Sequence, residues 1–177
     1  FKHDSGGASS LLEMQVRRLR DEQSRLMEML TSFVSTGQDN EDLFLKSKTL
    51  TLSLIQAKDM DSIIKTVESF FQEIIGADAC SLILAKDEEV KELESTTGLE
   101  MNKNSIHMGP FSQEKMSLLF QDNEMLSGVL SIFKVKDKFG LLKIGSSDQT
   151  KYLGDGDKTF IEYIRDVIAS VIELKDV

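Results

Sequence analysis

Hydrophobic residues near the start of the chain recur at alternating steps of four and three residues. This spacing repeats every seven residues and places the side chains in one line along an α-helix. A single apolar line has nothing within its own helix to pack against, so it predicts pairing with the same helix of a second copy. The line, called the seam below, consists of Leu12, Val16, Leu19, Gln23, Leu26, Leu30 and Phe33, with Gln23 as its polar member.

The flanks of the seam do not decide how two such helices would be oriented. In a parallel pair, Gln15 would face Arg20 and Glu22 would face Met27 across the dimer, and neither combination is an ion pair. Charge at these positions normally selects between parallel and antiparallel partners. Both orientations therefore stay open.

Beyond the seam, residues 35–40 weaken the helical pattern because they contain Gly37. One interpretation is a hairpin that folds residues 41–58 back on the seam, and the other is one long helix over residues 11–58. A glycine inside a helix costs only about 1 kcal/mol, which favours the long helix, straight or kinked. That helix would be about 70 Å long, and the glycine- and serine-containing residues 1–10 would form a flexible tail before it.

The pattern changes after residue 58, and residues 59–177 are predicted to form one domain. A wide apolar face that starts after Asp59 indicates a helix, which Gly76 is placed to stop. The apolar run Cys80–Ala85 predicts a strand, and Glu89–Leu93 predicts a second, more exposed strand near an edge of the sheet.

The second half of this domain repeats the alternation of helix and strand. Residues 94–110 lack periodicity and predict a long loop, after which Ser112 would cap a short helix. The apolar runs Gly128–Val135 and Phe139–Gly145 flank a polar turn and predict a hairpin. A last helix is predicted by an apolar stripe with helical spacing, with Asp157 as its cap; the stripe consists of Phe160, Ile161, Ile164, Val167, Ile168, Val171 and Ile172.

These elements predict an α+β fold in which helices flank an antiparallel sheet and a long coiled-coil helix precedes it. Helices before and after the strands imply one covered face of the sheet. Residues 94–120 would roof the opposite face, and a ligand pocket is expected there.

Three segments of the chain resemble one bacterial family. Gly140–Asp148 reads GLLKIGSSD, Gly154–Phe160 reads GDGDKTF, and Ser5–Gln15 reads SGGASSLLEMQ before an arginine-rich helix. Together they are similar to the family catalogued as domain of unknown function 484, over nearly the whole chain. The resemblance implies a GAF-like fold in a dimeric cytoplasmic protein with no assigned activity. GAF folds hold small ligands or serve only in dimerisation, and no ligand motif of theirs carries over to this sequence.

The composition of the chain disfavours nucleic acid and membrane as binding partners. The 177 residues carry a formal net charge of −9, and an acidic chain repels the phosphate backbone of nucleic acid. The basic cluster Arg17, Arg18, Arg20 and Arg25 is interleaved with acidic residues, which is typical of a solvated helix face. No apolar run approaches the roughly 20 residues that a membrane span needs. Cys80 is the only cysteine, which excludes an internal disulfide and favours a reducing, cytoplasmic setting.

Candidate chemistry is sparse. His107 lies in the predicted loop beside Met108 and Phe111, and Ser146 and Asp148 follow a predicted strand. These five residues are the candidate ligand contacts. The alternatives are a solvent-facing histidine and a turn capped by its own side chains. The motif of a serine nucleophile elbow is missing, so no enzyme, metal site or cofactor is predicted.

The sequence therefore predicts a non-enzymatic regulatory or ligand-sensing module, homodimerised by its N-terminal helix, with an unidentified small molecule as a potential ligand. The alternative is a dimeric scaffold that recruits another protein and binds no small molecule. Membrane is not an expected partner, and nucleic acid is disfavoured.

Overall fold

The computed structural model describes residues 5–121, 124–152 and 158–175, without the side chains of residues 5–9. The chain divides into two compact units, Phe1–Leu45 and Lys46–Val177. The second unit begins earlier than the domain boundary expected at Asp59, because the last turns of the first helix belong to it.

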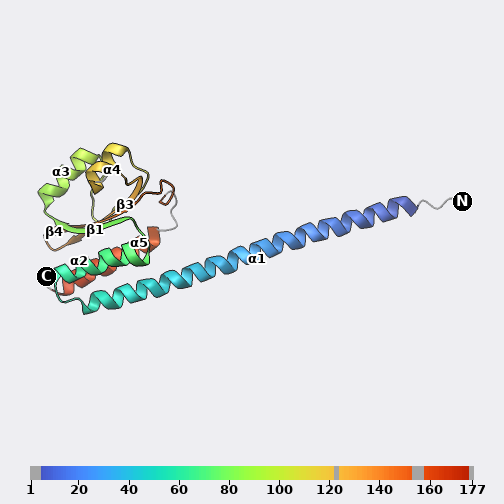
Figure 1. The fold of residues 1–177 in the computed structure, drawn as a ribbon, viewed down its shortest axis with the longest axis horizontal. Helices are drawn as coiled ribbons and strands as arrows, with labels where there is room; N and C mark the ends of the chain where they lie inside the picture. The colour runs from blue at the N-terminus through green and yellow to red at the C-terminus, as the bar shows by residue number, and fades with distance from the viewer. Residues whose placement is uncertain (1–4, 122–123, 153–157, 176–177) are drawn as a thin grey trace. The chain divides into compact units, whose positions relative to one another are not determined.

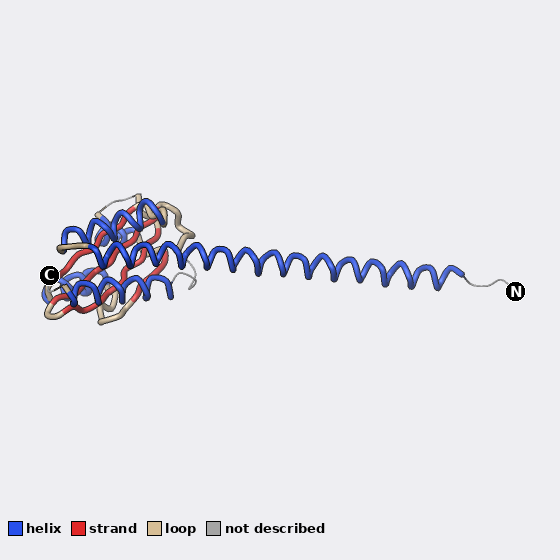
Figure 2. The backbone as a smooth tube through the Cα atoms, turned by 90° about the horizontal axis from the view of Figure 1, so that it is seen from below, coloured by secondary structure: helices blue, strands red, loops and turns tan. Residues whose placement is uncertain are grey.

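The first helix, α1, spans Ser5–Gln56 and therefore includes Gly37. Figure 2 shows it as one uninterrupted helix. This confirms the long helix and shows that the hairpin alternative was wrong. The helix begins at Ser5, so part of the segment predicted as a flexible tail is helical. No side chain lies within 4 Å of a Cβ built on Gly37, and the glycine therefore accommodates no tertiary contact.

The second unit contains a four-stranded sheet in the order β1-β4-β3-β2, in which every neighbouring pair is antiparallel. Helices α2 and α5 cover one face, and α3 and α4 lie over the other (Figure 1). This confirms the α+β class. In chain order the elements are α2 (Met60–Ser69), the π-helical turn η1 (Phe70–Ile74), β1 (Ala79–Ala85), α3 (Asp87–Thr97), β2 (Ile106–Gly109), α4 (Gln113–Phe120), β3 (Ser127–Val135), β4 (Lys138–Ser146) and α5 (Lys158–Leu174).

The larger core lies on the face covered by α2 and α5. The end of α1 contributes Leu50 and Leu54 to it, and both side chains are at most 1% exposed. Lys175, just after α5, donates from Nζ to the backbone carbonyls of Ile55 and Ala57 and so satisfies the C-terminal end of α1. The last turns of α1 are therefore an integral part of the second unit.

A second apolar core fills the opposite face of the sheet. Val90 of α3 and Leu119 of α4 pack with Leu130 and Ile132 of β3 and with Leu141 of β4. All five side chains are buried. The roof predicted from residues 94–120 is present only in part: α4 and the end of α3 lie over this face, whereas residues 106–109 form β2 within the sheet. Apolar side chains of the chain itself pack beneath these helices.

The predicted strand Glu89–Leu93 was wrong, since these residues lie inside α3. Acidic residues occupy the first turn of α3, where negative charge stabilises the positive end of the helix dipole. The backbone N–H of Lys86 donates to the Glu89 carboxylate at 2.7 Å, and Gly98 ends the helix with φ of +67°. The loop predicted for residues 94–110 was also wrong in part, because it contains the end of α3 and all of β2.

Other local predictions are confirmed. Asp59 caps α2 by accepting from the Ser62 backbone N–H at 2.8 Å, and Gly76 follows η1 with φ of +79°. Ser112 caps α4, and β3 and β4 form the predicted hairpin. The predicted cap Asp157 lies outside the described residues.

One backbone N–H of the outer strand β1 donates a hydrogen bond to a carboxylate. β1 ends the sheet on one side, and its Leu82 N–H donates to Glu68 Oε1 of α2 at 3.3 Å. The helix that covers the face of the sheet thus also reaches its edge.

Candidate functional site

The seam is an exposed apolar line in the first unit. Its apolar side chains are between 40% exposed, at Val16, and 79% exposed, at Phe33. Every residue from 10 to 42 is exposed in the single chain, including Gln23. A contiguous apolar surface of this kind marks an interaction site in proteins generally.

The flanks of the seam add to this surface. Met27 and Met29 are 60% and 61% exposed. The hydroxyls of Thr31 and Thr36 donate to the carbonyls of Met27 and Ser32 in their own helix. These hydroxyls therefore need no hydrogen-bond acceptor from a second chain. The surface therefore offers dispersion contacts and flexible thioethers, which suit the packing of another helix.

In its last turns α1 has two different apolar faces. Leu50 and Leu54, with Ala57 just after the helix, are buried in the second unit, whereas Leu52 and Ile55 are 51% and 58% exposed. The helix thus contributes one face to the core and presents another to the outside.

The candidate ligand residues do not share a face of the sheet. His107 pairs with Leu130, which belongs to the core under α3 and α4. Met108 pairs with Val129 and packs against the core on the side of α2 and α5. Successive strand residues point to opposite faces, so these two neighbours cannot contact one ligand from the same side.

His107 and Phe111, two of the candidate ligand residues, have contacts within the chain. His107 Nε2 lies 2.6 Å from the carbonyl oxygen of Glu100, and Phe111 packs against the core under α3 and α4. Both residues thus hold the segment around β2 in place.

Ser146 and Asp148 belong to a hydrogen-bonded turn at the end of β4. Asp78 Oδ2 accepts from Ser146 Oγ at 3.2 Å, from the Ser147 N–H at 2.7 Å and from Ser147 Oγ at 2.9 Å. The Ser147 donors hold the pKa of Asp78 below its usual value. Asp148 accepts from the backbone and hydroxyl of Thr150, which likewise lowers its pKa. These contacts are those of the self-capped turn weighed as the alternative to a ligand site.

A groove between α1 and α2 was not predicted from the sequence. It has a volume of about 350 Å³ and lies within the second unit. The π-helical turn η1 forms one end of it, and such turns are frequent at functional sites. Its lining is Thr49, Leu50, Ser53, Lys65, Thr66, Ser69, Phe70, Glu73 and Ile74.

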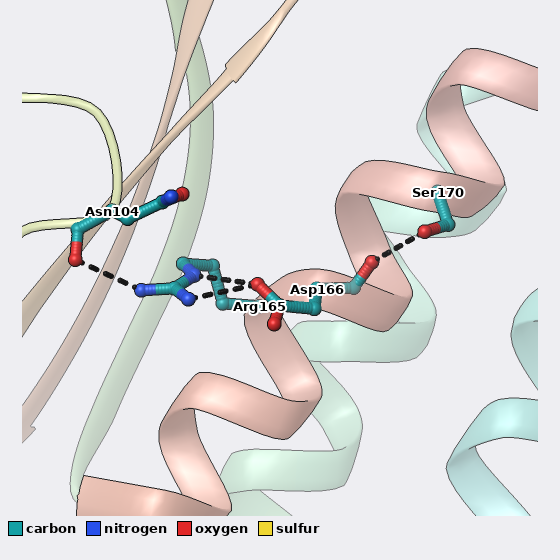
Figure 3. Close-up of polar contacts among 4 residues, drawn as sticks. All are labelled: Asn104, Arg165, Asp166 and Ser170. Atoms are coloured by element: carbon teal, nitrogen blue, oxygen red, sulfur yellow. Dashed lines mark hydrogen bonds and ion pairs between the residues drawn. The ribbon is translucent and has the colours of Figure 1, made fainter.

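Arg165 of α5 is a second feature that the sequence analysis missed. Although only 6% exposed, it donates from Nη1 to the carbonyl of Asn104 at 3.0 Å (Figure 3). Its Nε and Nη2 lie 2.9 and 2.8 Å from Asp166 Oδ1. Asn104 has φ of +69°, so Arg165 fixes a left-handed backbone turn just before β2. The signal in the sequence was a charged residue inside the apolar stripe of the last helix.

Cys80, the single cysteine of the chain, lies in the core on the face covered by α2 and α5. Burial raises the pKa of Cys80, and a buried protonated thiol is a poor nucleophile. Within the described ranges no group of three or more histidine, cysteine or acidic residues is placed to hold a metal ion. No helix among the described residues has the length and apolar character needed to span a membrane.

The sequence was compared with protein-family models and with curated proteins. Residues 1–175 match the family model described as protein of unknown function, DUF484. The comparison with curated proteins gave no match. The family match therefore covers both units of the chain.

Proposed function

The chain belongs to the DUF484 family, and from that premise we propose that it is a non-enzymatic, homodimeric scaffold whose copies pair through the seam of α1. The folded second unit would then be presented twice to a protein partner. The carrying observation is the exposed line of apolar side chains from Leu12 to Phe33.

The energetics support pairing over exposure. Full burial of a leucine- or phenylalanine-sized side chain contributes about 1.5–3 kcal/mol. The leucine and phenylalanine side chains of the seam are more than half exposed, so pairing would recover about half or more of that free energy at each of these positions. Association itself costs at least about 4 kcal/mol, so several seam residues must act together.

The test of the dimer replaces two seam residues with aspartate. Leu19→Asp with Leu26→Asp places four carboxylates in the seam of a dimer, and burying an unpaired charge costs several kcal/mol. We expect a monomer by light scattering at concentrations where the unmodified chain has the mass of a dimer. The matched control is Leu11→Asp with Met14→Asp, which adds the same charge to residues that are 58% and 62% exposed but lie outside the seam.

Loss of the dimer in the first variant but not in the control supports the seam. An unmodified chain with the mass of a monomer, or a seam variant with the mass of a dimer, would contradict the proposal. Far-UV circular dichroism of both variants verifies that the second unit remains folded.

A ligand-sensing module is the second candidate, and the groove between α1 and α2 is the observation that favours it. Native mass spectrometry of the purified chain tests it: a stoichiometric small-molecule adduct supports sensing. The adduct should be lost in Ser53→Phe, which fills the groove, and kept in Lys91→Phe on α3. A chain that carries no adduct, or that keeps it in Ser53→Phe, leaves the scaffold as the better description.

A further inference from the structure

We propose that two copies of this chain pair in parallel and in register along α1, and that the interface continues past the seam to Ile55. At Phe33 the contacting residues change from seven-residue to eleven-residue spacing. This inference rests on the proposed homodimer and specifies its geometry. The occupant of the exposed face at Leu52 and Ile55 is therefore the same face of the second copy.

The first observation is a second periodicity in the exposed residues of α1. Phe33, Phe44 and Ile55 are separated by eleven residues, and they are 79%, 66% and 58% exposed. Leu30 and Leu52 are two such intervals apart and are 60% and 51% exposed. Eleven residues complete about three turns of an α-helix, so each series stays close to one side of the helix.

The second observation is that one of the two seven-residue lines of the seam cannot continue, whereas the other leads from Leu30 through Gly37 to the exposed Phe44. Seven-residue spacing from Phe33 leads through residue 40 to Ser47 and Leu54, which are 6% and 0% exposed. These side chains pack within the second unit, with Leu50 and Ala57 beside them. A second copy that followed the line from Phe33 at seven-residue spacing would need a surface that the chain has already buried.

The two spacings also select the orientation. A seven-residue repeat favours a left-handed supercoil, whereas an eleven-residue repeat favours a right-handed one. Parallel pairing in register sets each segment against a segment of the same periodicity. Antiparallel pairing over the same length, from Leu12 to Ile55, would set the seven-residue segment of one copy against the eleven-residue segment of the other, and the two supercoils would conflict.

Single cysteines test this geometry in the full chain. Leu19→Cys reports on the seam, Ile55→Cys reports on the extension, and Ser53→Cys is the matched control. Ser53 is also exposed, but it lies close to the opposite side of the helix from Ile55. The unmodified chain, whose only cysteine is the buried Cys80, gives the background. Mild oxidation followed by non-reducing electrophoresis reads out the covalent dimer.

We expect Leu19→Cys and Ile55→Cys to shift to the mass of a dimer, and Ser53→Cys and the unmodified chain to stay at the mass of a monomer. A dimer by light scattering in which Leu19→Cys crosslinks and Ile55→Cys does not would refute the extension and leave the proposed function intact. A dimer in which neither crosslinks with itself would refute the parallel register. A chain that is monomeric by light scattering would refute the proposed function and this inference together.

A second measurement does not depend on disulfide geometry. Ile55→Lys should raise the dissociation constant of the dimer by about tenfold, because it places two like charges against each other in an apolar contact. Ser53→Lys should leave the dissociation constant of the dimer unchanged, because Ser53 lies close to the opposite side of the helix. Equal constants for the two variants would refute the extension.

Discussion

Gly140 of β4 faces a buried aromatic ring, and adding one methyl group there should destabilise the second unit. Gly140 pairs with Phe133 of β3, whose side chain is 1% exposed. A Cβ built on Gly140 would lie 2.0 Å from Phe133 Cζ and 2.2 Å from Cε2. Attractive carbon–carbon contacts lie at about 3.5–4.0 Å, so the ring would have to move by about 1.5 Å in Gly140→Ala.

The magnitude follows from the surroundings of the ring. Phe133 is packed within the core under α2 and α5, where neighbouring side chains restrict its movement. Overpacking a core by a methylene typically costs about 1–3 kcal/mol, and the overlap here is severe. We therefore expect Gly140→Ala to lower the free energy of unfolding by about 3 kcal/mol, measured by urea unfolding followed by circular dichroism.

A double-mutant cycle identifies the ring as the cause. Phe133→Leu removes the atoms that the new methyl group would meet, so it should cost less in the presence of Gly140→Ala than alone. The coupling between directly contacting residues is typically about 0.5–3 kcal/mol, and we expect a value of at least about 1 kcal/mol here. A loss below about 0.5 kcal/mol for Gly140→Ala, or strict additivity with Phe133→Leu, would refute the reasoning.

Three further outcomes are expected. Gly37→Ala should stabilise α1 by about 1 kcal/mol, because its Cβ would meet nothing within 4 Å; thermal melting at 222 nm measures this, and a lower melting temperature would contradict it. Asp78→Ala should lower stability at neutral pH. The folded-state pKa of Asp78 is depressed below 3.8, so its contribution is present above that pH and is lost as the pH falls through the depressed value; a stability difference that does not shrink in acid would exclude this role. Gln23→Ile should lower the dissociation constant of the proposed dimer by at least about tenfold in a sedimentation dilution series, and weaker association would place Gln23 outside the seam.

Elements with strong local signals could be predicted from the sequence. Asp59 and Ser112 cap helices because their side chains accept from backbone donors three residues ahead, a contact within one turn. The hairpin of β3 and β4 was predicted because two apolar runs flank a polar turn. Residues Glu89–Leu93 were assigned to an exposed edge strand, whereas the local signal for a helix was the acidic first turn of α3.

The candidate site was harder to predict because its residues depend on partners far away in the sequence. His107 and Met108 were grouped as loop neighbours, but their pairing with β3 turns them to opposite faces. The surroundings of Ser146 include Asp78, which lies 68 residues away. The two faces of α1 became separable only when the burial of Leu50 and Leu54 was known.

The carboxylate of Glu68 at Leu82 affects how copies of this protein meet at high concentration. An open strand edge is a template for continuing a sheet from one molecule into the next, the route by which many β-rich proteins form fibrils. On the β1 side, an incoming strand would have to displace Glu68 from the Leu82 amide and would meet its negative charge. The Glu68 carboxylate therefore disfavours pairing of β1 with a strand of another molecule. Glu68→Leu would remove both the hydrogen bond and the negative charge at this edge.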